Sequence, residues 1–268
     1  MNFIFWCEFP GRTNWKNLAN WLEELNLNIT IYIACTSRQN YEWWKREIKK
    51  TSNRIIVNAW PTLLKKDGYW FSGFVSKKNI DKLLEYQGLN VKIDQEPPFK
   101  GNYTNLRMIN YVLKYLFKKG KNNDYLLKTI KKLSKNSHIL VNMFPFPKWD
   151  LKRCGCYVPI TLKAKRQYMA YTSIPGPKLM GLMRVYDKIN FGLRKRKEKF
   201  TVSIGLIGEG ILNTEGVYKN TNDLKKDLEM VKSLKINDVC IYSIDAISKK
   251  NKSWLKVIKK YSTSPKQP

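Results

Sequence analysis

The segment Leu89-Asn90-Val91-Lys92-Ile93-Asp94-Gln95-Glu96-Pro97-Pro98 reads as a short buried strand that ends in two carboxylates. Val91 and Ile93 supply its apolar positions, and the two prolines after it cannot continue a sheet. Because side chains alternate along a strand, Asp94 and Glu96 point to the same side. Two neighbouring acids resist being charged together, so the sequence predicts a raised pKa for one of them, which gives a site both an acid and a base. The alternative is a solvated strand end where two acids happen to lie side by side.

Strand-like and helix-like segments alternate along the rest of the chain. The other strand-like runs are residues 2–8, 28–35, 54–59, 138–143, 167–172, 200–207 and 238–244. Apolar residues at helical spacing predict helices at about 14–25, 40–50, 76–86, 103–118, 124–135, 178–196, 222–234 and 253–261. The helix at 178–196 has an apolar side made of Leu179, Leu182, Met183, Val185, Tyr186 and Ile189. Residues 148–165 show little helical period, which predicts an irregular crossover in place of a fifth helix.

Eight strands joined mostly by helices favour parallel pairing, and eight parallel strands can close a barrel. We therefore predict an α/β fold, a single (β/α)8 TIM-like barrel over residues 1–261 with an irregular fifth βα unit. Residues 262–268 are predicted to be a disordered tail. The rival fold is an open doubly wound sheet, which would need a phosphate-binding fingerprint after the first strand. Phe9-Pro10-Gly11-Arg12 is not such a fingerprint.

The charge of the chain is large and unevenly distributed. The formal net charge is +29 over 268 residues. Residues 1–100 hold 15 Lys and Arg against 10 Asp and Glu, whereas residues 101–268 hold 35 against 11. Such a field attracts polyanions, including nucleic acid, anionic membrane surfaces and acidic glycans. The abundance of Asn, Ile, Tyr and Lys also fits a coding bias toward A and T, so a merely solvated basic surface is the competing explanation.

The remaining patterns predict a cytoplasmic protein that needs no cofactor and no metal. The N-terminal apolar run has no basic leader, and no segment approaches about 20 uninterrupted apolar residues, so neither a signal peptide nor a transmembrane segment is predicted. Three of the five cysteines sit in apolar runs typical of reduced thiols, and Cys154-Gly155-Cys156 with the single His138 lacks the ligands of a zinc site. Carboxylate-only magnesium binding stays open, with the ligands Glu8, Asp94, Glu96 and Asp245.

The active sites of such barrels gather at the C-terminal ends of the strands. The acids expected there are the catalytic candidates Glu96, Asp94, Glu8 and Glu209. The expected substrate-binding residues are Trp6, Trp60, Trp70, Tyr171, Tyr242 and Asp245. Aromatic faces bind the apolar faces of sugar rings, and glycosidic cleavage requires two or three carboxylates. The sequence thus predicts a glycoside hydrolase with a carbohydrate substrate, while any single Trp has the alternative of a chance position in an aromatic-rich chain.

Ile93-Asp94-Gln95-Glu96, Tyr168-Met169-Ala170-Tyr171 and the eight-strand order resemble the chitinase-type glycoside hydrolases and, more loosely, the lysozyme-like barrels with a D-x-E ending on strand four. The resemblance implies that Glu96 is the general acid, that Asp94 orients a substrate acetamido group serving as the nucleophile, and that Tyr171 contacts this acetamide. An N-acetylated glycan would then be the substrate. The family's longer D-x-x-D-x-D-x-E is reduced here to its last two acids, with Asn90 and Lys92 upstream. Thr172 stands where an acid usually follows the tyrosine, and Tyr242 stands where the family has a tryptophan.

A second hypothesis is a catalytically inactive barrel that binds a polyanion, either nucleic acid or an acidic glycan, through its basic C-terminal half. Its main feature is the run Arg194-Lys195-Arg196-Lys197-Glu198-Lys199, with Lys163, Lys165 and Arg166 nearby in sequence. Cations at a helix C-terminus also suit the helix dipole, which gives part of the run a local explanation.

Lys92 is expected to point the same way as Asp94 and to lie deeper, where it would neutralise the acidic pair.

Overall fold

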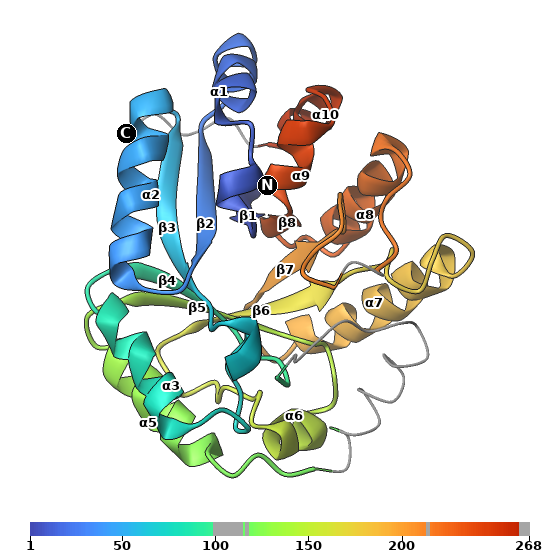
Figure 1. The fold of residues 1–268 in the computed structure, drawn as a ribbon. Helices are drawn as coiled ribbons and strands as arrows, with labels where there is room; N and C mark the ends of the chain where they lie inside the picture. The colour runs from blue at the N-terminus through green and yellow to red at the C-terminus, as the bar shows by residue number, and fades with distance from the viewer. Residues whose placement is uncertain (99–114, 116–117, 213–214, 263–268) are drawn as a thin grey trace.

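Eight parallel strands close into a barrel in the order of the sequence (Figure 1). The computed structural model describes residues 1–98, 115, 118–212 and 215–262. The strands are β1 (Asn2–Cys7), β2 (Ile29–Cys35), β3 (Ile55–Pro61), β4 (Asn90–Asp94), β5 (His138–Met143), β6 (Lys165–Ala170), β7 (Thr201–Ile204) and β8 (Asp238–Tyr242). The first and last strands pair with Asn2 opposite Asp238 and Trp6 opposite Tyr242. This closure confirms the predicted (β/α)8 barrel and excludes the open doubly wound sheet.

Helices follow the strands and surround the barrel. They are α1 (Trp15–Glu24), α2 (Arg38–Thr51), α3 (Lys77–Asp81), α5 (Asn123–Leu133), α6 (Lys148–Cys154), α7 (Met180–Lys195), α8 (Thr221–Ser233), α9 (Ile244–Lys249) and α10 (Ser253–Tyr261). The described part of the chain also holds three short 3-10 helices, η1 (Pro10–Arg12), η2 (Lys65–Asp67) and η3 (Lys82–Tyr86). None of the described helices has both the length and the hydrophobicity that a membrane crossing requires.

The fifth βα unit differs in detail from the prediction. The crossover expected to be irregular throughout begins with the seven-residue helix α6, and it is irregular from there to β6. Gly155 ends α6 in the left-handed region at φ +66°, which glycine adopts without strain. The helix expected at 103–118 falls almost entirely outside the described residues, and the predicted disordered tail does so from 263 onward.

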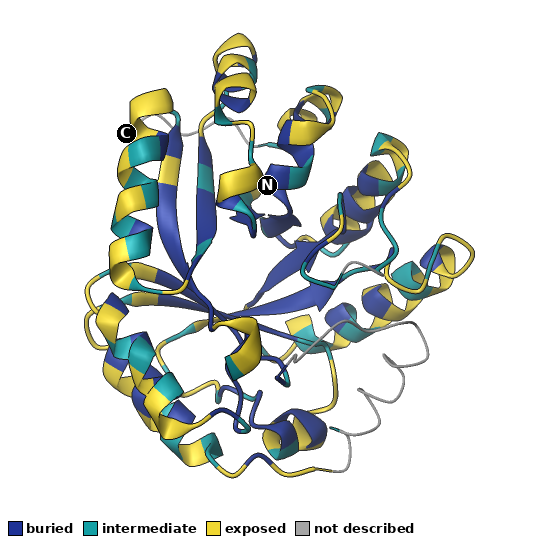
Figure 2. Cartoon of the chain, viewed as in Figure 1, coloured by how far each residue is buried: buried dark blue, intermediate teal, exposed yellow. Residues whose placement is uncertain are grey.

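The barrel has an outer core between sheet and helices and an inner core inside the sheet. Side-chain alternation along β4 separates the two: Val91 and Ile93 join the outer core, whereas Lys92 lies against Trp6 in the interior. Figure 2 shows the strands almost wholly buried and the helices buried on one side only. The inner cluster consists of Trp6, Tyr32, Trp60, Leu140, Leu206, Cys240 and Tyr242. All five cysteines are buried and free, which the apolar runs predicted for three of them, Cys7, Cys35 and Cys240.

Helix α7 turns its apolar side away from the barrel. Its buried positions are Met180, Asp187 and Phe191. The apolar side identified in the sequence is exposed instead, with Leu182 at 65% and Ile189 at 60% exposure. The reason lies partly in the polar contacts that α7 makes toward the molecule: Arg184 forms an ion pair with the buried carboxylate of Asp227.

Candidate active site

A narrow cavity opens at the C-terminal ends of the strands. Its volume is about 60 Å³, and an apolar hollow of about 190 Å³ adjoins it and shares Trp70, Glu96, Phe144 and Glu215 with its wall. Four carboxylates line the narrow cavity, namely Glu8, Asp94, Glu96 and Glu215. All five aromatic residues predicted at the strand ends line it as well, namely Trp6, Trp60, Trp70, Tyr171 and Tyr242. The strand-end rule therefore gathered most of the predicted residues around one cavity.

A buried ion pair joins Asp94 in the cavity wall to Lys92 in the barrel interior. Lys92 is fully buried, and its Nζ lies 2.9 Å from Asp94 Oδ2. The same Nζ sits 2.9 Å and 3.4 Å from the ring centroids of Trp6 and Trp60, so the ammonium is held between two aromatic faces. Burial lowers the pKa of Lys92 to about 8, against the opposing attraction of Asp94. Lys92 thus lies deeper than Asp94 on the same side of the strand, as the alternation predicted.

Asp94 is fixed on both of its oxygens. Oδ2 faces Lys92, and Oδ1 accepts a hydrogen bond of 3.0 Å from Nδ2 of Asn142, its register partner on β5. Burial raises the pKa of Asp94, and Lys92 and Asn142 act in the opposite direction. We assign Asp94 as the ionised member of the acidic pair, because both oxygens receive donors and one donor is a cation.

Glu96, unlike Asp94, has no cation paired with it among the described residues. Its side chain is buried. Burial, followed by the charge of Asp94, raises the pKa of Glu96 well above its ordinary value. The backbone next to it is held by the Gln95 N–H, which donates to the carbonyl oxygen of Asn142 at 2.9 Å. The raised pKa of Glu96 agrees with the i, i+2 spacing, which predicts a raised pKa for one of the two acids.

Glu8 is hydrogen-bonded to two of the loops that surround the cavity and to the end of β8. Its Oε1 accepts from the hydroxyl of Tyr69 at 2.9 Å, and its Oε2 accepts from the hydroxyl of Tyr242 and from the Ile211 N–H at 3.0 Å. Burial raises the pKa of Glu8 to about 7 despite these donors. Asp245, predicted to bind substrate, does not line the cavity. It is buried in α9 and accepts from the Glu8 N–H at 3.2 Å, which makes it a positioning residue for Glu8.

The acid contributed by the seventh strand end is Glu215, and the prediction of Glu209 is not supported by its position. Glu209 is exposed and does not line the cavity. The backbone after it packs closely against the cavity wall: a Cβ on Gly210 would collide with the Tyr242 hydroxyl, and the Ile211 N–H donates to Glu8. Burial raises the pKa of Glu215 to about 8. The only sign of Glu215 in the sequence is that it is a second acid in the same loop, six residues after Glu209.

Four of the predicted aromatic residues, Trp6, Trp60, Tyr171 and Tyr242, pack against one another along the cavity wall. The ring centroids of Trp6 and Trp60 are 5.2 Å apart, and the ring of Tyr242 packs edge-on against Trp6 at 5.5 Å. Tyr171 lies 5.9 Å from Tyr242, and its hydroxyl is 3.2 Å from Ser203 Oγ. Trp70 packs in a separate small cluster at the mouth, which also includes Tyr69, Ile211 and Leu212.

The buried acids predict that the protein is more stable in mild acid than at neutral pH. The folded pKa of Glu8 is about 7 and that of Glu215 about 8, both above the ordinary 4.5, and that of Asp187 is about 7 against 3.8. The folded state therefore binds more protons than the unfolded state between about pH 4.5 and 8. The stabilisation is complete below the unfolded pKa values and is lost as pH rises through the folded ones. For Glu8 it amounts to about 3 kcal/mol.

We expect the melting temperature to be several degrees higher at pH 5 than at pH 8 in thermal unfolding followed by circular dichroism. Glu8→Gln should flatten part of this slope, whereas Glu209→Gln, at an exposed position, should leave it unchanged. A melting temperature that rises from pH 5 to pH 8 would contradict the prediction.

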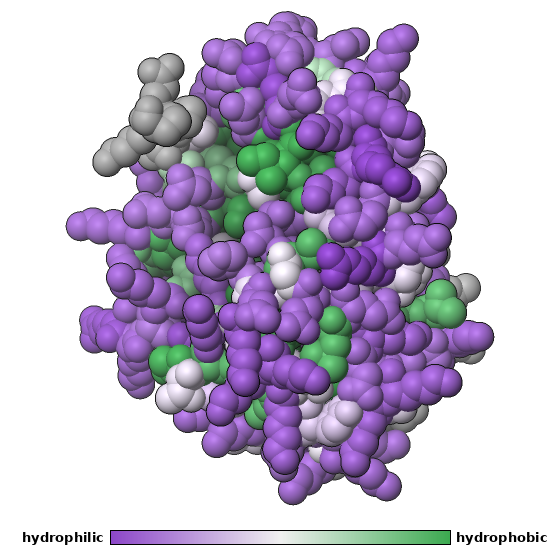
Figure 3. All heavy atoms as spheres, turned by 90° about the vertical axis from the view of Figure 1, so that its left-hand side faces the viewer, coloured by the Kyte–Doolittle hydropathy of each residue, from purple (hydrophilic) through white to green (hydrophobic). Residues whose placement is uncertain are grey.

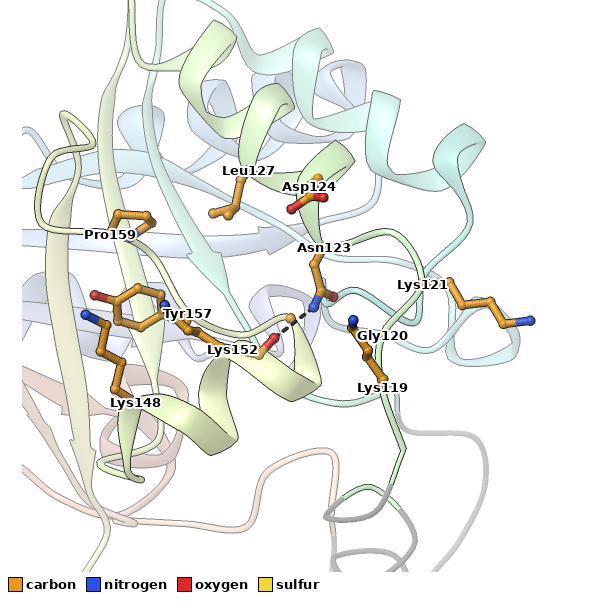
Figure 4. A pocket seen from close by; sticks show the side chains of 11 residues that line it. Lys119, Gly120, Lys121, Asn123, Asp124, Leu127, Lys148, Lys152, Tyr157 and Pro159 are labelled. Atoms are coloured by element: carbon orange, nitrogen blue, oxygen red, sulfur yellow. Dashed lines mark hydrogen bonds between the residues drawn. The ribbon is translucent and has the colours of Figure 1, made fainter.

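A larger and more basic hollow lies on the other side of α6. It has a volume of about 950 Å³, and Lys119, Lys121, Lys148 and Lys152 line it together with Tyr157 and the start of α5. Figure 4 shows Tyr157 between Lys148 and Lys152, whose Nζ atoms lie 5.4 Å and 5.8 Å from the ring centroid. Asp124 is the one carboxylate in this lining, so the hollow lacks the pair of acids that acid–base chemistry needs. Among the described residues, no group of three or more His, Cys, Asp or Glu is arranged to hold a metal ion.

Comparisons with known proteins find similarity of structure only. No known protein-family profile matches the sequence, and no curated protein matches it. The glycoside hydrolase domain of PgaB (BpsB) from Bordetella bronchiseptica superposes with a TM-score of 0.59 at 10% identity, over 96% of this chain and 98% of that one. The spore cortex-lytic enzyme SleL of Bacillus megaterium QM B1551 superposes with a TM-score of 0.58 at 10% identity, over 99% of this chain and 75% of that one. At this identity the likeness establishes the barrel fold.

Proposed function

We propose that this barrel is a glycoside hydrolase in which Glu96 is the general acid. The observation that carries the proposal is the contrast at the end of β4 between the buried Glu96, which has no ion-pair partner among the described residues, and Asp94, which forms an ion pair with Lys92. Both groups line one cavity with six aromatic side chains, which suit sugar rings. The two superposable barrels support the reading, because one is described as a glycoside hydrolase domain and the other as a cortex-lytic enzyme.

The roles follow from the protonation states. Glu96 delivers its proton to the glycosidic oxygen as the bond to the leaving sugar breaks, and the carboxylate of Asp94 stabilises the positive charge that develops on the sugar ring. If the substrate carries an N-acetyl group beside the reacting carbon, the acetamide oxygen attacks that carbon. Asp94 and Tyr171 hold the acetamide during this attack, which forms a cyclic oxazolinium ion. A water molecule that gives its proton to the Glu96 carboxylate then opens this ion at the same carbon, and the two successive inversions leave the configuration retained.

Glu8 and Glu215 are the other carboxylates that could assist. Glu8 already accepts three hydrogen bonds, so its lone pairs are largely occupied, and we assign it to holding the loops in place. Glu215 lies at the mouth with a pKa of about 8 and is the better candidate for activating a water. Cleavage with inversion and a requirement for Glu215 would replace the acetamide route by a water-mediated one.

The polyanion-binding alternative has weaker support. Several cations of the predicted basic cluster are engaged within the molecule: Arg166 pairs with Glu198 at 2.8 Å, and Lys165 pairs with Asp238. Arg194 donates to the carbonyl oxygens of Pro145 and Phe146. These contacts give the cations structural roles and reduce the charge that the cluster presents to a ligand.

The direct test is release of reducing ends from a glycan panel by the full-length protein. The panel should include chitin oligosaccharides, their de-N-acetylated counterparts, peptidoglycan and neutral glucans. We expect turnover of at least one amino-sugar polymer, with nuclear magnetic resonance of the first anomer formed reporting the stereochemistry. A protein that is folded yet inert on the whole panel would overturn the proposal.

Trp70 is expected to bind a sugar ring at the mouth of the cavity. Trp70→Ala should weaken glycan binding about ten-fold, because an aromatic platform contributes roughly 1–2 kcal/mol. Its ring is only 7% exposed but packs outside the main core, so the loss of melting temperature should be smaller than for a core tryptophan. Isothermal titration calorimetry in a Glu96→Gln background avoids hydrolysis. Trp43→Ala, at a 45% exposed position of α2, is the matched control and should change neither quantity.

A further inference from the structure

The exposed side of α7 carries a continuous apolar stripe. The α7 apolar stripe consists of Leu179, Leu182, Val185, Tyr186, Ile189 and Leu193, each between 47% and 65% exposed. These positions recur at three- and four-residue spacing, which places them on one side of the helix. The opposite side, at Met180, Asp187 and Phe191, is the one that packs on the molecule. Scattered apolar residues are normal on a surface, but a contiguous row marks a contact surface.

Basic side chains border the stripe. Lys178 precedes the helix, Lys188 is exposed along it, and Arg196, Lys197 and Lys199 are exposed beyond its end. The two acids between residues 174 and 199 are withdrawn from the surface: Asp187 is buried, and Glu198 pairs with Arg166. The face is therefore apolar along its centre and cationic at its margins. In contrast, the side of the molecule where α2, α3 and α5 lie is mainly hydrophilic (Figure 3).

We propose that the α7 apolar stripe docks on an anionic lipid bilayer, with α7 lying in the plane of the headgroups. A helix with an exposed apolar face, Lys and Arg at its margins and long aliphatic stems on those cations has the features of an interfacial helix. Charge complementarity selects the occupant. A second copy of this chain would bring another +29 against the same basic margins, whereas anionic headgroups neutralise them. The proposal is independent of glycan cleavage, because the stripe does not line the catalytic cavity.

The test is co-sedimentation of the full-length protein with phosphatidylcholine vesicles, with and without phosphatidylglycerol. We expect binding to vesicles that contain phosphatidylglycerol, weaker binding as salt rises, and little binding to phosphatidylcholine alone. Leu182→Gln/Ile189→Gln removes two stripe residues but keeps good helix formers, and it should weaken binding by about ten-fold or more. The matched control is Ile56→Gln/Ile160→Gln, two isoleucines that are each 59% exposed elsewhere, and it should bind as the wild type does.

Three outcomes would overturn the proposal. If the stripe variant binds vesicles as well as the wild type, charge alone recruits the protein. If its melting temperature falls by several degrees and that of the control does not, the stripe packs within the chain. If light scattering shows a wild-type dimer that the stripe variant abolishes, the occupant is a second copy.

Discussion

Replacement of Glu96 by glutamine is expected to lower turnover about 10²–10⁴-fold on a glycan with a poor leaving group. Glutamine keeps the shape of the side chain but has no acidic proton to deliver. Binding should change little, because the amide still fits the same wall. The melting temperature should not fall, since the variant removes a buried titratable group that has no ion-pair partner among the described residues. Initial rates and calorimetric binding to the same oligosaccharide separate the two quantities.

The control for this experiment is Glu209→Gln. Glu209 was an equal candidate by its place after the seventh strand, but it is exposed and outside the cavity, so its variant should retain wild-type turnover. The wild-type rate should fall on the alkaline side of the pH profile, because burial and Asp94 raise the pKa of Glu96 and the protonated form is the active one. Full activity of Glu96→Gln on any glycan that the wild type cleaves would refute the assignment.

The predictions that succeeded rest on the geometry of single strands. The period of two along β4 placed Asp94 and Glu96 on one side and Lys92 beneath them, and the parallel barrel gathered Trp6, Trp60 and Tyr171 at the same end. These inferences do not depend on how the loops between the strands are folded. The chain order of the strands was sufficient.

The positions that differ from expectation depend on contacts distant in sequence. Glu209 lies just after the predicted strand run 200–207, but β7 ends at Ile204, the Gly210–Ile211 backbone packs against Tyr242 and Glu8, and Glu215 is the acid of this loop that lines the cavity. Asp245 accepts a hydrogen bond from the backbone N–H of Glu8 and does not line the cavity. Helix α7 shows a similar limit. The helical periodicity of residues 178–196 correctly predicted a helix. The ion pair between Arg184 and Asp227 helps to determine which side of this helix packs on the barrel, and the local sequence does not contain that contact.

Lys92→Met is expected to have the largest effect on stability. The substitution keeps most of the volume between Trp6 and Trp60 but leaves the carboxylate of Asp94 buried without its cation. Breaking a buried ion pair in this way costs about 3–5 kcal/mol. For a chain of this length that corresponds to a fall in melting temperature of roughly 10 °C. The pKa of Asp94 should also rise, because Lys92 is the main group that opposes its desolvation.

Two further variants identify the cause. Lys92→Met/Asp94→Asn removes both charges and should recover most of the lost stability, because two neutral groups need no counter-ion. It should not recover activity, since the charge that stabilises the reacting sugar is gone. Lys165→Met breaks the ion pair with Asp238, whose side chains are 48% and 33% exposed, and should cost no more than about 1 kcal/mol. If Lys92→Met and Lys165→Met lose equally little stability, the ion pair with Lys92 does not hold Asp94 in its charged state. The proposal that Asp94 acts as the charged carboxylate and Glu96 as the general acid would then lose its physical basis.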